Sequence, residues 1–454
     1  MIRMPGCYLH FLFTFGGNGL SYSEGWSRNF EMCNKSDTKH RRLIIDTDLG
    51  LDDLVALAIL RVQQCLVDSR GGGDGDGDQP PLFHVAGVTL TSGISLANAE
   101  NAQMLRRILP PNTPVYVSGS NYIDTSSSSS SSSSLLTPSH RDIANVNKPI
   151  WWSRTANRVL SFLSSLPQPH ASPFCSANNE INTTISAEQF IASNMDDSNV
   201  DFLCLAPLST VARALLLRCS SVSTRTSAPK ASFYIMGGIQ SDSRVTKRGE
   251  STAPFGYNDP KSRDTDQEIS NEYDNFGEFN FALDIHAART VLSAIPNVRL
   301  IPLESCTLVP ESLRSNTENY GMTSLSLSCI LKDIPPNDCD SSPDLHIARN
   351  NLRMLFREFG TIETQWDSIA AAIYCNAFDN NVSTPGSVDC VSTKIGLCKR
   401  LDSREMKISD LGEIMCTGQQ ADDEIPSAFL WVYPNFTLED ETNFVRYLEI
   451  LLKS

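Results

Sequence analysis

The sequence lacks any uninterrupted apolar stretch of the roughly 20 residues that a membrane-spanning helix needs. It also has no C-x-x-C pair among its 13 cysteines, so neither a zinc knuckle nor a closed disulfide framework is indicated. Basic residues are few: 37 Lys plus Arg stand against 52 Asp plus Glu, a net charge of −15. This balance argues against broad binding to nucleic acid or anionic membranes and fits a cation or a neutral small molecule. We therefore expect a soluble protein with reduced, mostly buried thiols.

The N-terminal stretch "YLHFLFTFGGNGL" has an apolar centre, but it contains a histidine and lacks a basic start or a small-residue cleavage site. For this reason we expect no secretory signal and a cytoplasmic protein. Residues 1–41 are predicted to be a flexible N-terminal extension, and residues 42–454 to form the folded domain.

Apolar runs of strand length alternate with segments of helical period along residues 42–454. The runs are rich in β-branched residues and leucine without clean alternation, which is typical of strands that are covered on both faces. The sequence therefore predicts an α/β fold: a single domain with a mostly parallel, helix-covered sheet. Low-complexity segments that cannot contribute to a core predict long loop insertions near 69–81, 123–150 and 240–275.

Four carboxylates crowd one turn, "RLIIDTDLGLDD", directly after the first apolar run: Asp46, Asp48, Asp52 and Asp53. In a parallel sheet, ligands collect beyond the carboxyl ends of the strands, where this turn is expected to lie. A helix dipole accounts for one or two acids in a first helical turn. Four converging carboxylates repel one another unless a cation neutralises them or some stay protonated. Asp and carbonyl oxygens suit Ca²⁺ or Mg²⁺. The absence of His and Cys from this turn argues against zinc.

Two other motifs compete for this turn. An EF-hand is excluded, because Gly50 lies one place early for the glycine of that loop and no Glu closes it. A phosphatase-type DxD motif, with Asp46 as the phosphorylated nucleophile, stays open as an alternative. Leu49 and Gly50 replace the Gly-Thr of that motif, however, and the second acidic pair is then unexplained.

The turn closely resembles the DTDPGxDD signature of the nucleoside hydrolase (inosine-uridine hydrolase) family, with Leu49 in place of the usual Pro. Further segments resemble family motifs in family order: "VAGVTLTSG", "APLSTVA", "MGG", "GEFNFALDIHAA", "LIPLESCT" and "QWDSIAAA". The resemblance covers residues 42–374 in blocks. It implies calcium-dependent hydrolysis of the N-glycosidic bond of ribonucleosides.

The resemblance implies a calcium site formed by the side chains of Asp48, Asp53 and Asp367 and the backbone carbonyl of Leu205. Asp48 would also be the base that deprotonates a calcium-bound water, because a metal lowers the pKa of water and a carboxylate then takes the proton. Asp46 would orient its neighbours. For Asp367 a simpler interpretation stays open, since an acid in front of "SIAAAIY" is typical of a helix N-cap.

The substrate-binding residues implied by the resemblance are Asp52, Glu278, Asn280, Asn271 and Trp366. Asp52 would accept ribose hydroxyls, while Glu278 and Asn280 would bind the ribose and stabilise an oxocarbenium-like transition state. Trp366 replaces the histidine of many members, and its indole N–H is no general acid. It would instead stack on a purine, as in the purine-preferring branch, although a core tryptophan is the alternative.

The sequence also departs from the family pattern in the segments that would hold the sugar. Ile94 stands where the second-strand motif has an asparagine, and Thr210 replaces another asparagine. The H-G-x-x-G motif survives at best around His140. A catalytically weak or inactive protein that binds nucleoside and calcium is therefore the first alternative function, and a DxD-type phosphatase the second. We expect a small-molecule nucleoside as partner, no nucleic acid and no membrane, and leave a homo-oligomer open.

Overall fold

The structure, a computed structural model, describes residues 41–70, 83–119, 150–166, 185–221, 228–240, 278–306, 342–359, 366–375, 399–401, 406–408, 413–416, 430–432 and 438–453. All of them lie within one compact unit, His40–Ser454. Apart from residues at their ends, the expected extension 1–41 and the expected insertions near 69–81, 123–150 and 240–275 lie outside this part of the chain.

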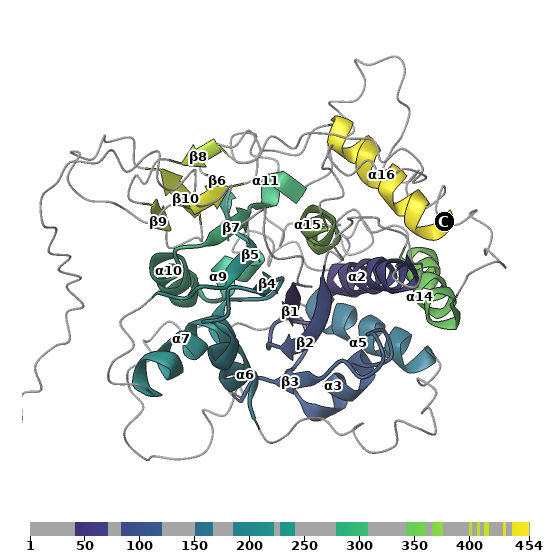
Figure 1. The fold of residues 1–454 in the computed structure, drawn as a ribbon, viewed down its shortest axis with the longest axis horizontal. Helices are drawn as coiled ribbons and strands as arrows, with labels where there is room; N and C mark the ends of the chain where they lie inside the picture. The colour runs from purple at the N-terminus through teal and green to yellow at the C-terminus, as the bar shows by residue number, and fades with distance from the viewer. Residues whose placement is uncertain are drawn as a thin grey trace, which may run out of the picture. The chain divides into compact units, whose positions relative to one another are not determined.

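A central sheet organises the described residues (Figure 1). Seven of its eight strands run parallel, and only the edge strand β8 is antiparallel to its neighbour. From edge to edge the order is β3 (Val115–Val117), β2 (His84–Leu90), β1 (Arg42–Thr47), β4 (Val200–Cys204), β5 (Ser232–Met236), β7 (Val298–Ile301), β11 (Leu430–Val432) and β8 (Lys399–Leu401). A small second sheet has the order β6 (Ile239–Gln240), β10 (Glu413–Cys416) and β9 (Met406–Ile408). The predicted α/β fold with a mostly parallel sheet is confirmed.

The strand order reverses between β1 and β4, which lie side by side at the centre of the sheet. At such a switch point the crossover helices on the two sides leave in opposite directions, so a crevice opens beyond the carboxyl ends of the two strands. The register pairs Asp46 of β1 with Thr89 of β2 on one side and with Cys204 of β4 on the other. The acidic turn that follows β1 therefore begins at the edge where an α/β sheet binds its ligands.

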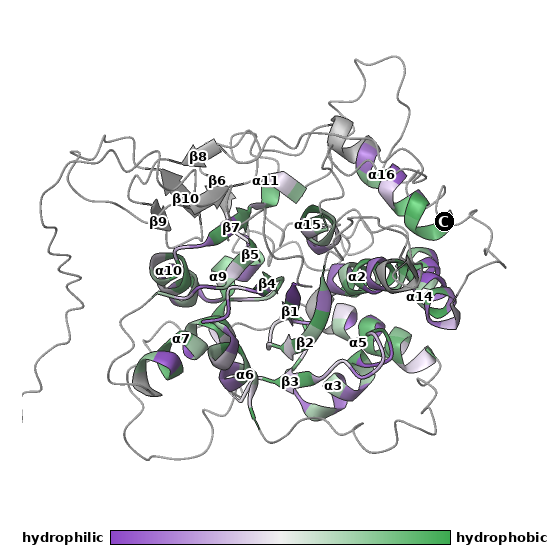
Figure 2. Ribbon diagram, viewed as in Figure 1, coloured by the Kyte–Doolittle hydropathy of each residue, from purple (hydrophilic) through white to green (hydrophobic). Residues whose placement is uncertain are grey.

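Helices cover both faces of the sheet (Figure 1). One face carries α2 (Leu51–Arg70), α3 (Ala99–Leu105), α5 (Ile150–Ser165), α11 (Leu303–Cys306), α14 (Pro343–Phe359), α15 (Trp366–Tyr374) and α16 (Leu438–Lys453). The other carries α6 (Ala187–Asn194), α7 (Ser209–Ser221), α9 (Phe279–Leu283) and α10 (Ile285–Ala294). Hydrophobic and hydrophilic residues are both present along helices such as α10 and α14 (Figure 2), as expected for helices with one face against a sheet.

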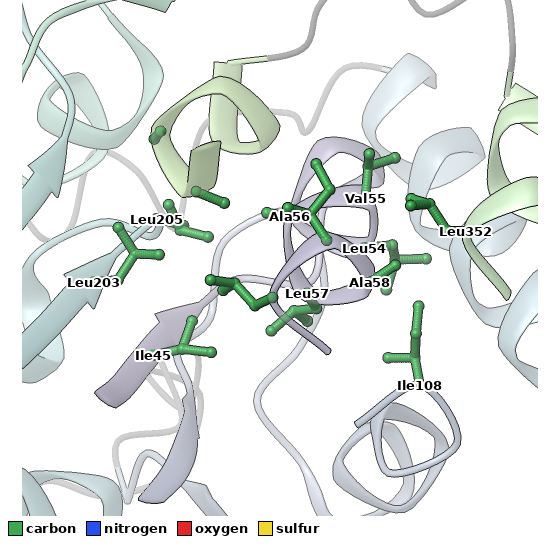
Figure 3. Close-up of a cluster of buried hydrophobic side chains, with 14 of the residues drawn as sticks. Ile45, Leu54, Val55, Ala56, Leu57, Ala58, Ile108, Leu203, Leu205 and Leu352 are labelled. Carbon is green, nitrogen blue, oxygen red and sulfur yellow. The ribbon is translucent and has the colours of Figure 1, made fainter. Parts of the chain in front are cut away.

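The two cores follow from the alternation of side chains along each strand. Ile44 packs in the core under α6 and α7, whereas its neighbour Ile45 packs in the core under α2. Figure 3 shows Ile45, Leu203 and Leu205 among apolar residues of α2. Every residue of β4 and β5 is buried, and apart from Asp201 and Ser232 both strands are apolar in the sequence.

Other local features stabilise the helices at the ends of the sheet's connections. Asp284 caps α10, its Oδ1 accepting a hydrogen bond from the N–H of Ala287 at 3.0 Å. The C-terminal strand and helix are present as β11 and α16. The guanidinium groups of Arg349 and Arg353 on α14 donate to the carbonyls of Leu451 and Leu452 at 2.8 and 2.7 Å, and so satisfy the last turn of α16. Among the described residues, no helix combines the length and the apolar character that a membrane crossing requires.

Candidate active site

The acidic turn connects β1, which ends at Thr47, to α2, which begins at Leu51. Asp52 and Asp53 therefore lie in the first turn of α2, near the positive end of its dipole. Asp53 is held from both sides: its Oδ1 accepts from the Thr47 hydroxyl and its Oδ2 from the N–H of Gly50 at 2.9 Å. The carboxylate of Asp53 is thus fixed by the turn itself.

Asp48 is held by the loop that follows β2. Its Oδ2 accepts a hydrogen bond from the backbone N–H of Ile94 at 2.9 Å. A Cβ atom added to the neighbouring Gly93 would lie 2.0 Å from the same oxygen, so the loop approaches Asp48 more closely than any other residue type allows. A Cβ on Gly50 would meet oxygens of Asp53, Asp52 and Asp48 at 2.7, 3.1 and 3.6 Å. The three carboxylates therefore surround one glycine.

Asp367 joins this group from the distant helix α15. Carboxylate oxygens of Asp52, Asp53 and Asp367 all lie within 4.8 Å of one another. Asp367 is 4% exposed, and its Oδ1 has no hydrogen-bond partner among the described residues. An N-cap role alone does not explain a buried oxygen without a partner. At the far end of α15, the Tyr374 hydroxyl donates to Asp201 of β4 at 3.2 Å and so fixes the helix along the sheet.

The four carboxyl groups share one electrostatic problem. Burial is the main cause that raises the pKa of Asp52 to about 7 and the pKa of Asp48 and of Asp367 well above the ordinary range. Repulsion from neighbouring carboxylates adds to each of these shifts. The pKa of Asp53 is raised by burial as well, although hydrogen bonds led by that from Thr47 oppose the shift. The cluster favours whatever supplies positive charge, protons or a cation.

The donor set fits a divalent cation. It consists of carboxylate oxygens, which hard ions such as Ca²⁺ and Mg²⁺ prefer. It includes the buried Asp367 Oδ1, which no donor among the described residues satisfies. The three residues whose carboxylate oxygens lie within 4.8 Å of one another include Asp52, which the resemblance assigned to the substrate. Asp48 is not among these three, although it interacts with Asp53. The assignment of Asp48 and Asp53 as ligands together with Asp367 stays a prediction.

Asp46 lies deeper, at 1% exposure. The hydroxyls of Thr89 and Thr91 both donate to its Oδ1, at 2.7 and 2.8 Å, and its Oδ2 has no partner among the described residues. Burial raises the pKa of Asp46 to about 7. Thr91 also hydrogen-bonds Thr210 of α7, O–O distance 2.6 Å. The threonines were missed in the sequence, because their position beside Asp46 depends on the pairing of β2 with β1.

The backbone carbonyl of Leu205, just beyond β4, accepts a hydrogen bond from the Asn280 side-chain amide at 3.1 Å. The same amide reaches the carbonyl of Met236 at the end of β5, at 3.3 Å. Asn280 therefore connects the ends of two neighbouring strands at the edge where the acidic turn lies.

Glu278 acts as the N-cap of α9. Its carboxylate accepts from the backbone N–H groups of Asn280, Phe281 and Gly238, at 2.8, 3.0 and 2.7 Å. The residue is 2% exposed. These hydrogen bonds give Glu278 a local structural role that the resemblance did not imply, and its proposed contact with a sugar stays a prediction.

Trp366 is the first residue of α15, next to Asp367, and is half-buried against the core under α2. Asn271 and His140 lie outside the described residues. Ile94 contributes its backbone N–H to the site, a function that any residue except proline can perform. The replacement of the family's asparagine at this place therefore leaves the support of Asp48 intact.

Comparison with known proteins identifies one family. The sequence model of one family, described as "Inosine-uridine preferring nucleoside hydrolase", matches residues 43–395. No curated protein sequence matches the chain significantly.

The chain also matches solved structures at low sequence identity. One is a purine-preferring ribonucleoside hydrolase from Gardnerella vaginalis (15% identity, TM-score 0.48, covering 91% of this chain and 99% of that one). Another is an inosine-guanosine nucleoside hydrolase (15% identity, TM-score 0.47, covering 91% and 99%). A third is a plant nucleoside hydrolase (12% identity, TM-score 0.45, covering 92% and 100%). At these TM-scores the similarity identifies no substrate for the chain.

Proposed function

Because the chain belongs to the inosine-uridine preferring nucleoside hydrolase family, we propose that it is a calcium-dependent, purine-preferring N-ribohydrolase. Family membership makes it a hydrolase that acts on N-glycosyl compounds. The observation that supports the calcium dependence is the convergence of Asp52, Asp53 and Asp367, whose carboxylate oxygens lie within 4.8 Å of one another at the carboxyl ends of the strands. That convergence requires a positive charge, and its oxygen ligands suit calcium.

In the proposed reaction, a water oxygen attacks the anomeric carbon of the ribose, the bond from that carbon to the base nitrogen breaks, and ribose and free base result. Asp48 takes the proton that the water loses. The N–H of Ile94 holds Asp48 Oδ2 at 2.9 Å and leaves the carboxylate fixed during this transfer. A bound calcium ion would supply the charge that keeps the surrounding carboxyl groups ionised and lowers the pKa of nearby water.

The remaining residues bind and orient the substrate. Asp52 is half-buried at the start of α2, where its carboxylate can accept hydrogen bonds from ribose hydroxyls. Trp366 is only partly buried, and a purine can stack on its ring, so that the leaving base takes its proton from solvent. Base stacking on an aromatic ring contributes about 1–3 kcal/mol, enough to favour purines.

The phosphatase alternative is disfavoured by the environment of Asp46. A phosphorylated nucleophile must reach the phosphate, but Asp46 is 1% exposed and accepts two threonine hydroxyls on one oxygen. The other alternative, a homologue that binds nucleoside and calcium without turnover, is favoured by Ile94, whose side chain cannot hydrogen-bond a sugar.

One assay distinguishes these functions. The purified full chain is incubated with inosine, guanosine, uridine and a phosphate ester, each with calcium or with a chelator. Release of free base only with calcium, and faster from inosine and guanosine than from uridine, is the expected result. Nucleoside binding without base release would identify the inactive homologue, and inorganic phosphate would identify the phosphatase. Base release that persists in chelator would contradict the calcium requirement.

A further inference from the structure

Leu49 occupies a backbone conformation that leucine rarely adopts. Its φ is 63°, and among the described residues only Asn112 is another non-glycine residue with positive φ. The left-handed region is unfavourable for an L-residue, and asparagine enters it more readily than leucine. Leu49 is also fully buried in the core under α2. A costly conformation at a buried residue persists only when its surroundings impose it.

The left-handed conformation aims two backbone N–H groups at the acidic site. The N–H of Leu49 donates to Thr47 Oγ1 at 3.1 Å, and that hydroxyl donates to Asp53 Oδ1. The N–H of the next residue, Gly50, donates to Asp53 Oδ2 at 2.9 Å. Both oxygens of Asp53 therefore depend on the course of the backbone through Leu49.

The same turn is tied to the loop that holds Asp48. The N–H of Ser95 donates to the carbonyl of Asp48 at 3.1 Å, and the Ser95 hydroxyl contacts the carbonyl of Leu49 at 3.4 Å. The neighbouring residue in that loop, Ile94, donates to the Asp48 carboxylate. A change of backbone conformation at Leu49 would thus move Asp48 and Asp53 relative to each other.

We propose that Leu49 is a positioning residue: its left-handed backbone, acting through Thr47, sets the distance between the carboxylates of Asp48 and Asp53 that a cation needs. The inference rests on the proposed function, because that function assigns Asp48 and Asp53 to calcium binding. Proline, which the resembling signature has at this place, has φ fixed near −65° and no N–H. It would lose both the turn and the hydrogen bond to Thr47. Leucine at position 49 is therefore not exchangeable with the family's residue.

Three variants separate backbone from side chain. Leu49→Ala, Leu49→Gly and Leu49→Pro all remove the buried side chain, but alanine keeps the N–H and glycine also accepts positive φ at no cost. Titration calorimetry measures calcium binding to the folded protein, and circular dichroism measures the folded fraction. We expect all three to melt earlier than the wild type. Calcium affinity should stay close to wild type in Leu49→Gly and Leu49→Ala and fall roughly tenfold or more in Leu49→Pro.

A second pair of variants keeps the test decisive if Leu49→Pro does not fold. Thr47→Val removes the hydroxyl without a large change of shape and should weaken calcium binding, while Thr47→Ser keeps the hydroxyl and should restore it. Thr290→Val, on the exposed side of α10, is the matched control and should bind calcium as the wild type does.

Wild-type affinity in both Leu49→Pro and Thr47→Val would overturn the proposal, as would an equal loss in Leu49→Gly and Leu49→Pro, which would indicate side-chain packing. A wild-type chain that binds no calcium would overturn it as well. A wild-type chain that binds calcium but releases no base leaves this proposal standing and refutes the hydrolase function, so the two failures are distinct.

Discussion

Carboxylate oxygens of Asp53, in the first turn of α2, and Asp367, in the first turn of α15, lie within 4.8 Å of each other. Both residues are buried, so the first turns of two helices bring negative charge to one point. Such an arrangement is stable at neutral pH only if a cation or protons compensate the charge.

Asp367→Asn should therefore weaken calcium binding. The change keeps the shape of the side chain and removes one negative charge, and we expect the affinity to fall by at least about tenfold. Titration calorimetry measures the affinity directly. Asp197→Asn is the matched control, because Asp197 lies in the turn before β4, at the amino ends of the strands, and its side chain is 38% exposed. Equal affinities in wild type and Asp367→Asn would exclude Asp367 as a ligand.

Asp48→Asn should abolish most base release. An amide cannot take a proton from water, and removing a general base lowers rates by roughly 100-fold to 10,000-fold. The readout is the rate of base release from inosine at saturating calcium, with circular dichroism to show that the variant folds. A variant with the wild-type rate would refute the role of Asp48, and Asp48→Ala should behave in the same way.

Gly93→Ala should reduce activity although it adds one methyl group. The new Cβ would lie 2.0 Å from Asp48 Oδ2, so either the carboxylate or the loop must move. Gly119→Ala is the matched control, since its Cβ would meet its nearest neighbours at 3.6 and 3.7 Å, which is ordinary contact. We expect the rate of base release to fall about tenfold or more in Gly93→Ala and to stay near wild type in Gly119→Ala. Equal rates in the two variants would show that the approach of the loop to Asp48 is unimportant.

Trp366→Phe should weaken the preference for purines. Phenylalanine keeps a stacking surface but a smaller one, so we expect the ratio of kcat/KM for inosine over uridine to fall by less than about tenfold, and further in Trp366→Ala. Competition between the two nucleosides in one reaction measures this ratio. An unchanged ratio in Trp366→Ala would identify Trp366 as a residue of the core only.

The calcium-free protein should lose stability as the pH rises. Burial raises the pKa of Asp52 to about 7 and also raises those of Asp48, Asp53 and Asp367, so the folded state binds more protons than the unfolded state above about pH 4. Protonation of these carboxyl groups stabilises the folded state fully below their pKa in the unfolded chain. This stabilisation is lost as the pH rises through their pKa in the folded protein. In chelator, Tm should fall between about pH 5 and pH 8.

Calcium should reverse this fall at high pH and have little effect at low pH, where protons occupy the same oxygens. Scanning calorimetry of the same samples with and without calcium measures both effects. A Tm in chelator that rises over this range would contradict the raised pKa values.

Much of the candidate site could be inferred from local sequence. The four carboxylates in one turn after a strand indicate Asp48, Asp52 and Asp53, and the resemblance of a later motif adds Asp367. The hydrogen bonds that hold the neighbouring Asp46 could not be inferred from the sequence. Thr89 and Thr91 hold Asp46 only because β2 pairs with β1 in one register, and pairing between strands is not encoded in either strand alone.

By itself, the sequence determined the fold class and the position of the acidic turn. Strands that are buried on both faces are visible as apolar runs, and the polar residues that follow such a run mark the end of the strand. The tertiary structure decided which carboxylates share one space, since that depends on how α15 packs along the sheet. The tertiary structure also decided the left-handed conformation of Leu49 and the close contacts of Gly93. At such positions the hydrogen bonds and packing of the neighbours outweigh the backbone preference of the single residue.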